Sequence, residues 1–374
     1  MAAPGETIDE PTDEPFDVPI DVMVDDLRRL VEAESPSHDL ASLASCAAVL
    51  SSIIEARTGV APVMVEGPDG AHVLWSGGGS PRVLILGHYD TVFPLGTLAV
   101  RPFAVVDGRA TGPGVFDMKG GIVQAIHAVA GLDDASGVEI LFTSDEEVGS
   151  ESSRQLLEAR ALACGNVLVL EPSADGGAVK TGRKGAGTFE LIIHGRAAHA
   201  GLEPENGRNA LVEAAHQVLA IDQFGDLAAG TSVTPTVAHV GTADNVVPAE
   251  ARIRVDVRIT SATEQSRVVA LMAAIVPVTP DITIDVIGSI GRPPMPVESS
   301  AELFPLAQAV DPTLIGVAVG GASDGNFTAA LGVPTLDGLG AVGGGAHADH
   351  EWIDVATMPA RVALLRGIVS QIVT

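Results

Sequence analysis

Short, largely apolar runs that each end in a polar or charged residue constrain the fold of this chain more than any other feature. Three of them have the length of strands: VLILGH (83–88), VEILFTS (138–144) and NVLVLE (166–171). Stretches with helical spacing of apolar residues lie between and before them, over about 22–33, 40–57, 120–131 and 152–161. A strand that is apolar along its whole length is buried on both faces, as in a sheet covered by helices on both sides. The pattern therefore predicts an α/β fold with a mainly parallel sheet.

The segment 185–291 has a different pattern, in which long stretches alternate between apolar and polar residues. GTFELIIHG, SVTPTVAHVG and ARIRVDVRIT have this period of two, and helical stretches near 207–222 and 263–275 interleave with them. Alternation is typical of a half-exposed, largely antiparallel sheet with helices on one face. After GRPPMP the first pattern returns and ends in a helix near 355–372. We therefore predict one α/β domain made of two sequence pieces, 22–184 and 292–374, with an α+β domain inserted over 185–291.

The N-terminal segment 1–21 is acidic, with seven Asp or Glu residues and no Lys or Arg. A secretory signal peptide needs a basic start and an apolar centre, so this composition indicates an acidic, mobile tail on a cytoplasmic protein. The chain has no uninterrupted apolar run of about 18 residues, and we expect no membrane span. The formal net charge of −27 argues against a nucleic-acid partner, because phosphates are bound by Lys and Arg. Cys46 and Cys164 lack neighbours at zinc-finger spacing, so we expect both to be buried as small apolar side chains.

Acidic and histidine residues collect at the ends of the predicted strands or in the loops just after them. They lie in GHYDTVFP, GPGVFDMKGG, TSDEEVGS, LEPS and GGGAHADHEW, and they comprise His88, Asp90, Asp117, Glu146, Glu147, Glu171 and His347. Each motif alone has a plain structural interpretation, such as a capping residue, a solvated turn or a surface charge. In an open α/β sheet, however, ligand sites form outside the carboxyl ends of the strands. Residues from several remote segments that converge on this edge indicate a binding site.

The mixture of two imidazoles and three carboxylates suits borderline divalent ions such as Zn²⁺, with Co²⁺ and Mn²⁺ as alternatives. Two such ions about 3.5–4 Å apart need a carboxylate that both share. Asp117 suits this role, because a short side chain in a Gly-rich loop is open to approach from both sides. His88 and Asp90 lie on one side of the chain if the strand continues, so Asp90 is expected to accept the second imidazole N–H.

Three consecutive acids, Asp145, Glu146 and Glu147, place like charges side by side. Such repulsion is tolerable where cations lie nearby. We therefore expect Glu147 to be a metal ligand. Glu146, its neighbour, is expected to point elsewhere, take a proton from water and deliver that proton to a leaving nitrogen.

These motifs, in this order along nearly the whole chain after the tail, resemble those of the M20 family of dinuclear zinc peptidases and deacylases. The likeness is nearest to its glutamate carboxypeptidase (carboxypeptidase G2-like) branch. The resemblance implies a zinc-peptidase catalytic domain with an inserted lid and dimerisation domain, and two divalent metal ions per subunit. It implies one ion held by His88, Asp117 and Glu171, another held by Asp117, Glu147 and His347, Glu146 as the catalytic base, and Asp90 as the residue that orients His88.

The resemblance also extends to residues that would contact substrate. His199, in RAAHAG, matches a histidine that the family often takes from the partner subunit to stabilise the oxyanion. Arg258 and Arg292 match positions that bind the C-terminal amino-acid moiety, and Arg is suited to a two-point grip on a carboxylate. An ordinary ion pair on a strand is the alternative for Arg258. Asn245, in TADNVVP, matches a donor from the lid.

Two motifs near the C-terminus have less definite roles. Ser323 and Asp324, in GGASDGN, resemble a loop that lines the active site. His350 and Glu351 follow His347 so closely that His350 is an alternative ligand, although His347 directly follows the Gly-rich loop as in the family.

The resemblance implies a metal-dependent amidohydrolase that cleaves an amide next to a free carboxylate and releases a C-terminal amino acid such as glutamate. Its substrate would be a small peptide or an N-acyl amino acid. An N-acyl-amino-acid deacylase of the aminoacylase, acetylornithine or succinyl-diaminopimelate type is the alternative among enzymes, and a non-catalytic dimeric binding protein is the alternative outside them. The lid further implies a homodimer formed through this domain, and hinges near 183–187 and 290–293.

Overall fold

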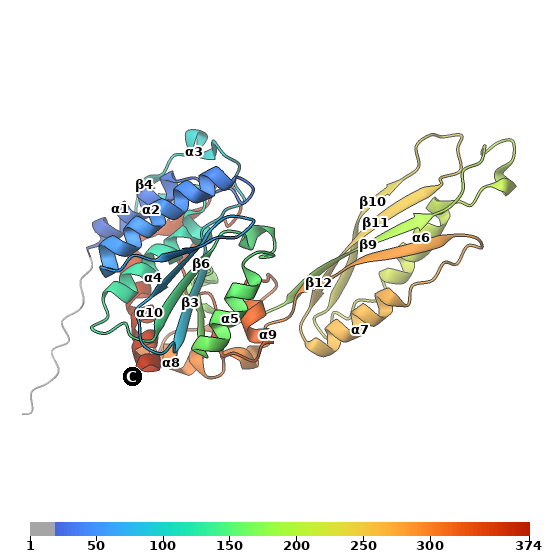
Figure 1. Ribbon diagram of the computed structural model, residues 1–374. Helices are drawn as coiled ribbons and strands as arrows, with labels where there is room; N and C mark the ends of the chain where they lie inside the picture. Colours follow the sequence, from blue (N-terminus) through green and yellow to red (C-terminus); the bar gives the residue numbers. More distant parts are fainter. Residues whose placement is uncertain (1–18) are drawn as a thin grey trace, which may run out of the picture.

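The computed structural model describes residues 19–374, which form two bodies joined by extended segments (Figure 1). Most of the predicted acidic tail, 1–21, therefore lies outside the described residues. Its last two residues differ from the prediction, because Ile20 and Asp21 already belong to helix α1 (Ile20–Glu32). The helix begins this early because its next turns bury Met23 and Leu27 in the core.

The larger body is built on a six-stranded sheet with the strand order β1-β2-β6-β3-β7-β14. Strands β6, β3, β7 and β14 are parallel, whereas β1 and β2 extend the sheet antiparallel at one edge. The apolar runs predict β3, β6 and β7 but not the edge strands, which are short or partly exposed. The bounds are β1 Val63–Val65, β2 His72–Ser76, β3 Val83–His88, β6 Val138–Thr143, β7 Val167–Val169 and β14 Thr335–Leu336.

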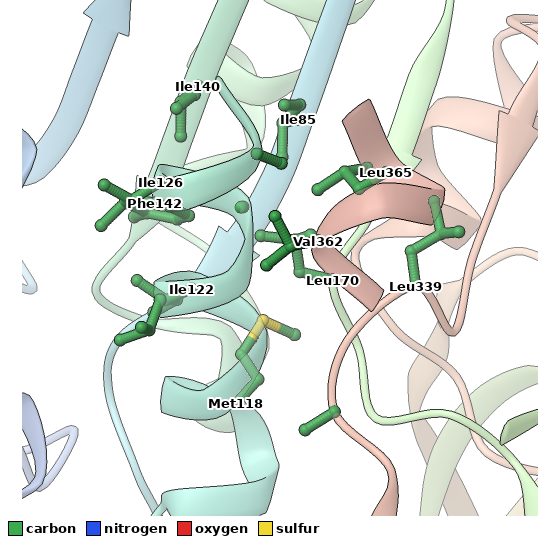
Figure 2. Close-up of a cluster of buried hydrophobic side chains, with 14 of the residues drawn as sticks. Ile85, Met118, Ile122, Ile126, Ile140, Phe142, Leu170, Leu339, Val362 and Leu365 are labelled. Carbon is green, nitrogen blue, oxygen red and sulfur yellow. The ribbon is translucent and has the colours of Figure 1, made fainter. Parts of the chain in front are cut away.

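Helices cover both faces of this sheet, which explains why its central strands are apolar throughout. Ile85 of β3 points to the face that packs against α4 and α10 (Figure 2), while Leu84 and Leu86 point to the opposite face, where α5 and α9 pack. Successive residues of one strand thus supply two separate cores. The helices on the first face are α1, α2 (Leu40–Thr58), α4 (Gly120–Ala130), α8 (Leu303–Val310) and α10 (Met358–Val373), and those on the second are α5 (Arg154–Cys164) and α9 (Gly325–Ala330).

Helix α2 is the one helix within residues 19–374 that is long and apolar enough to cross a membrane, judged by length and composition alone. One side of it, including Leu43, Leu50 and Ile54, is buried in the core of the larger body. Packing within this body therefore accounts for its apolar composition. The prediction for the cysteines is confirmed, because Cys46 and Cys164 are both buried and unpaired.

The smaller body is a four-stranded antiparallel sheet, in the order β10-β11-β9-β12, with two helices on one face (Figure 1). Alternate residues of β11, such as Ile253 and Val255, point into a core shared with these helices. Strand β12 is absent from the sequence prediction, since Gly288 and Gly291 interrupt its apolar alternation. The bounds are β9 Gly185–His194, α6 Ala210–Ile221, β10 Ser232–Val240, β11 Glu250–Ile259, α7 Ala262–Ala273 and β12 Thr283–Arg292.

The two crossings between the bodies lie side by side, because β9 begins at Gly185, β12 ends at Arg292, and Ala186 pairs with Arg292. The larger body adds two small sheets near the crossings and the loops. One pairs β8 (Val179–Arg183) with β13 (Gly316–Val319), and the other joins β15 (Gly343–Gly344), β16 (Trp352–Asp354), β5 (Arg109–Thr111) and β4 (Ala104–Val106). A single turn of helix, α3 (Thr97–Val100), precedes β4.

Candidate metal centre and active site

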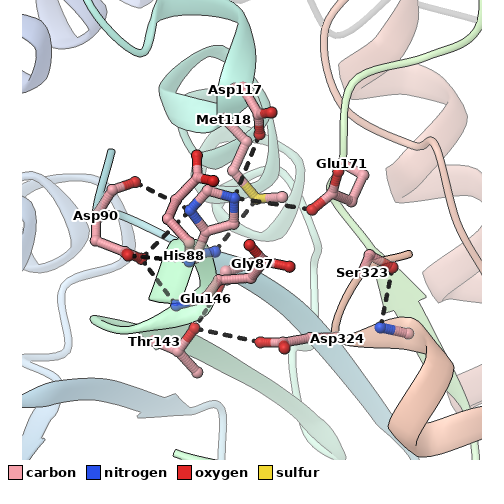
Figure 3. Close-up of polar contacts among 12 residues, drawn as sticks. Gly87, His88, Asp90, Asp117, Met118, Thr143, Glu146, Glu171, Ser323 and Asp324 are labelled. Carbon is pink, nitrogen blue, oxygen red and sulfur yellow. Dashed lines mark hydrogen bonds and ion pairs between the residues drawn. The ribbon is translucent and has the colours of Figure 1, made fainter. Parts of the chain in front are cut away.

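The carboxyl edge of the larger sheet brings together the five residues predicted as metal ligands. His88 is the last residue of β3, and Glu171 follows β7, the neighbouring parallel strand (Figure 3). Glu147 lies in a short turn after β6, the strand on the other side of β3. Asp117 lies in the turn before α4, and His347 lies in the loop before β16.

These side chains form two groups of three that share Asp117, and one candidate ligand atom of each member lies within 4.8 Å of the others in its group. His88 Nε2 lies 3.3 Å from Asp117 Oδ1 and 3.7 Å from Glu171 Oε1. His347 Nε2 lies 3.2 Å from Asp117 Oδ2 and 3.1 Å from Glu147 Oε1. Each oxygen of Asp117 therefore faces a different imidazole, as a carboxylate shared by two ions requires.

The spacing of these atoms fits bound divalent cations. Neighbouring ligands on a tetrahedral ion with bonds of ~2.1 Å are about 3.4 Å apart, close to the distances within each group. In addition, Asp117 Oδ1 is buried and accepts no hydrogen bond from any described residue. A buried carboxylate oxygen without a partner is unfavourable, and a cation between His88, Asp117 and Glu171 would supply that partner.

The pKa values of these groups reflect the burial of several carboxylates close together. Burial raises the pKa of Glu171 to about 8, and the carboxylate of Asp117 adds to the effect. Hydrogen bonds with Asp117 and Glu147 raise the pKa of His347 to about 10. Burial opposes a charge on His88, but its contacts with Asp117 and Asp90 raise its pKa well above the usual value. Divalent ions would supply positive charge and leave the imidazoles neutral.

Asp90 is shared between His88 and the turn that carries the two glutamates. Its carboxylate accepts hydrogen bonds of 3.2 Å from the backbone N–H groups of both Glu146 and Glu147, and one of 2.7 Å from the hydroxyl of Ser37. His88 Nδ1 lies 3.0 Å from the backbone carbonyl of Asp90 and 3.4 Å from its carboxylate. Asp90 thus orients the imidazole of His88 and also holds the backbone of the turn from which the side chains of Glu146 and Glu147 project.

Glu146, the predicted base, belongs to neither metal group and is held by Arg292. The Arg292 guanidinium donates to the Glu146 carboxylate, to the Glu146 carbonyl oxygen (2.7 Å) and to Ser150 Oγ (3.1 Å). It also lies 3.7 Å from Asp324 and over the ring of Phe327. Burial opposes the charge of Arg292, but Glu146 and Asp324 outweigh it and raise its pKa. The end of β12 is therefore bound directly to the predicted base.

A cavity of about 600 Å³ opens beside this contact, between the two bodies. Arg154, Arg258 and Arg292 line it, together with the acidic residues Glu151 and Asp256. Arg258 pairs with Asp256 through hydrogen bonds of 3.0 and 2.9 Å, and Arg154 pairs with Glu158. All three arginines are thus paired with carboxylates of the chain, and an anion that enters the cavity would compete for them, with Arg292 the one that contacts Glu146.

His199 and Asn245 lie away from this centre. They are neighbours on the smaller body, where the N–H of Ala200 donates to the carbonyl oxygen of Asn245, and both are exposed. They follow the His194 end of the sheet, whereas Arg292 is at the Gly185 end of β9. Because β9 has ten residues, these ends are roughly 30 Å apart. The structure does not bring His199 or Asn245 to the metal groups of the same chain.

The structure brings His347, not His350, to the predicted ligands: His350 belongs to neither group within residues 19–374. Ser323 and Asp324 lie beneath the site, where Asp324 accepts hydrogen bonds from Ser150 and Thr143 and Ser323 donates to Asp337. Burial raises the pKa of Asp324 to about 7, although Arg292 opposes the shift.

Two buried residues that the sequence analysis left without a role support the ligands. Arg183 donates to Asp337 (2.5 and 3.1 Å) and to Glu171 Oε2 (3.3 Å). Glu351 accepts three backbone hydrogen bonds around Asp117. Neither residue has a sequence signal of its own, since an Arg at a strand end and a Glu after a His-rich loop are both common on protein surfaces.

Comparison with known proteins identifies the family of this chain. The sequence model that describes peptidase family M20/M25/M40 matches residues 84–371 of this chain. Carboxypeptidase G2 of Pseudomonas sp. is 32% identical over 308 residues, which cover 78% of this chain and 74% of that protein. Succinyl-diaminopimelate desuccinylase of Dechloromonas aromatica is 29% identical over 335 residues, which cover 82% and 88%. Aminopeptidase PepT from Bacillus cereus has the same fold, with a TM-score of 0.76 at 20% identity over 95% of this chain and 99% of that one.

The predicted family and fold class are confirmed by these likenesses, and the alternative of a non-catalytic binding protein is set aside. M20 enzymes are metal-dependent, which agrees with the two groups of candidate ligands. The chain belongs to peptidase family M20 and is a hydrolytic enzyme of the metallopeptidase and amidohydrolase class.

Proposed function

We propose that this enzyme hydrolyses an amide bond next to a free carboxylate and releases a C-terminal amino acid such as glutamate from a small peptide or N-acyl amino acid. The observation that carries the proposal is the partly buried guanidinium of Arg292 against Glu146. In such a substrate one carbon atom separates the scissile nitrogen from the carboxylate. The cation that binds the substrate carboxylate must therefore lie beside the residue that gives a proton to the scissile nitrogen. Arg292 meets this condition, because it contacts Glu146.

The two groups that share Asp117 would hold two divalent ions per subunit, Zn²⁺ or alternatively Co²⁺ or Mn²⁺. His88, Asp117 and Glu171 form one set of ligands, and Asp117, Glu147 and His347 form the other. When bound, such ions polarise the scissile carbonyl and make water a better nucleophile at neutral pH.

Glu146 would act as the general base. Its carboxylate lies next to the ligands without being one of them, so it could take a proton from the attacking water and pass it to the leaving nitrogen once Arg292 releases it. Asp90 would keep Glu147 in place as a ligand and Glu146 in place as the base, because its carboxylate accepts hydrogen bonds from the backbone N–H groups of both residues.

Arg292 would change partners when substrate binds. In this structure it holds the carboxylate of Glu146 in an ion pair, so that carboxylate is not available to the attacking water. The carboxylate of a substrate would compete for the same guanidinium and leave Glu146 free to accept a proton. A substrate without that carboxylate would lack this means of activating the base.

His199 and Asn245 would act in the site of a second copy of this chain, since they lie far from the metal groups of their own. This arrangement requires a homodimer formed through the smaller body, which would also act as a lid. The proposed setting is the cytoplasm, with small-molecule substrates and with neither nucleic acid nor membrane as a partner.

An N-acyl-amino-acid deacylase is the second candidate function. Lys180 and Arg183 line a cavity of about 470 Å³ together with Asp175, and Arg183 contacts the predicted ligand Glu171. Cations in this place would suit an acyl group that carries its own carboxylate, such as succinyl. The succinyl-diaminopimelate desuccinylase relative adds support for this alternative.

A substrate panel on zinc- or cobalt-loaded protein tests both candidates through release of free amine. Acyl- and peptidyl-glutamates should be cleaved, and their α-carboxamides should be cleaved far more slowly. Equal rates on each acid and its carboxamide would refute the role of the carboxylate. A marked preference for succinyl over aminobenzoyl or peptidyl groups would favour the deacylase.

A further inference from the structure

Glu351 is a buried carboxylate that no step of the proposed reaction uses. It is 2% exposed and lies four residues after His347, just before β16. Its Oε1 accepts the backbone N–H groups of Phe116 (2.8 Å) and Asp117 (2.9 Å), and its Oε2 accepts that of Gly114 (2.9 Å). All three donors belong to the turn that carries the shared ligand Asp117.

Burial of this carboxylate needs an explanation, because a buried charge without strong partners is costly. A surface position would have spared the chain that cost. The three donors would, in turn, lack these acceptors if the side chain were absent, since a turn that projects a ligand cannot use them in regular secondary structure.

The turn around Asp117 is held from a second direction as well. The ammonium group of Lys119, which is 1% exposed, donates to the carbonyl oxygen of Ala33 at the end of α1 (2.9 Å). Glu351 therefore anchors the beginning of the turn and Lys119 its end. Asp117, between them, points both of its oxygens at imidazoles.

The segment that supplies Glu351 also supplies His347. Within this segment, the carbonyl oxygen of Ala348 accepts a hydrogen bond from the guanidinium of Arg101 (2.9 Å). A five-residue stretch thus has a predicted ligand at one end and the anchor of another predicted ligand at the other. The position of Asp117 and that of His347 are coupled through Glu351.

We propose that Glu351 is a positioning residue that sets Asp117 between the two imidazoles and ties the Asp117 turn to the His347 loop. The inference rests on the proposed function, in which Asp117 is shared by two ions. It assigns Glu351 no contact with substrate or metal. Its loss therefore weakens metal binding, because groups that orient ligands typically contribute roughly 10–100-fold to metal affinity.

The test compares Glu351→Gln and Glu351→Asp with Glu213→Gln in the full-length chain. Glu213 is an apt control, since it is also buried and accepts backbone N–H groups, from Val278 (3.0 Å) and Thr279 (2.7 Å), but lies in the smaller body. Both Glu351 variants should bind Zn²⁺ roughly 10–100-fold more weakly, and the visible spectrum of the Co²⁺-loaded protein should change. At saturating metal, kcat should fall while KM stays near that of the wild type. Glu213→Gln should lower the melting temperature and leave metal affinity and spectrum unchanged.

The outcomes separate this inference from the function on which it rests. If the wild type binds metal and both Glu351 variants match its affinity and Co²⁺ spectrum, the positioning role is refuted alone. If the wild type binds no divalent metal, the proposed function itself fails. If the metal-free Glu351 variants are unfolded while Glu213→Gln is folded, Glu351 serves general stability, and the inference is likewise overturned.

Discussion

Replacing Arg292 by Gln tests the link between substrate recognition and the base. The guanidinium contacts Glu146 twice, through its carboxylate and its carbonyl oxygen, and it contacts Ser150 once. Its side chain is 13% exposed, so its ion pair is poorly screened by solvent. Truncation of one partner of such a pair costs about 3 kcal/mol, which corresponds to a loss of roughly 150-fold in kcat/KM for a substrate whose carboxylate it binds.

A carboxamide substrate separates the two roles of Arg292. The wild type should prefer an acyl-glutamate over its α-carboxamide by about the same factor, and Arg292→Gln should lose that preference. On the carboxamide, the variant should turn over at least as fast as the wild type, because Glu146 is no longer neutralised. Amine release at fixed metal loading measures all four rates.

Arg154→Gln is the matched control for this experiment. Arg154 lines the same cavity but pairs with Glu158 instead of Glu146. The control should keep most of the preference for the acid over the carboxamide. If Arg292→Gln retains the wild-type preference, or if both variants lose it equally, the proposed exchange of partners is wrong.

Three further predictions concern the base, the dimer and the fold. Glu146→Gln should keep its bound metal, measured by elemental analysis, and lose about 10²–10⁴-fold in kcat. His199→Ala and Glu146→Gln should each be nearly inactive alone, whereas subunit exchange between them should restore about a quarter of wild-type activity, since half of the dimers would then hold one complete site. Burial raises the pKa of Asp26, but hydrogen bonds from His127 and Arg57 outweigh it and lower that pKa from 3.8 to about 2. Because the pKa of Asp26 is lower in the folded than in the unfolded protein, its ion pair stabilises the fold above the unfolded pKa, and this stabilisation is lost as the pH falls toward 2. Asp26→Asn should therefore lower the free energy of unfolding by about 2 kcal/mol at pH 7 and by little near pH 2, as measured by urea unfolding.

Strand direction predicts the position of three of the five ligands, whereas Asp117 and His347 lie in loops and were identified by the motifs shared with the M20 family. His88 and Glu171 end two apolar runs, and Glu147 comes soon after a third. Parallel strands place their carboxyl ends at one edge, so these side chains had to lie near each other whatever the loops did. The ion pairs of the buried arginines, in contrast, could not be predicted from sequence patterns. The pairs Arg292–Glu146 and Arg183–Asp337 join positions 146 and 154 residues apart, and the partner of an arginine leaves no mark on local periodicity.

The same two arginines connect the site to the joint between the bodies. Arg183 ends β8 just before the first crossing, and it reaches Glu171. Arg292 ends β12 at the second crossing, and it holds Glu146. The backbones of the two crossings are themselves paired, through the hydrogen bond from the N–H of Arg183 to the carbonyl oxygen of Met295 (2.8 Å). We therefore expect a change in the angle between the bodies to act on a predicted metal ligand and on the predicted base together, because each crossing carries an arginine bound to one of them.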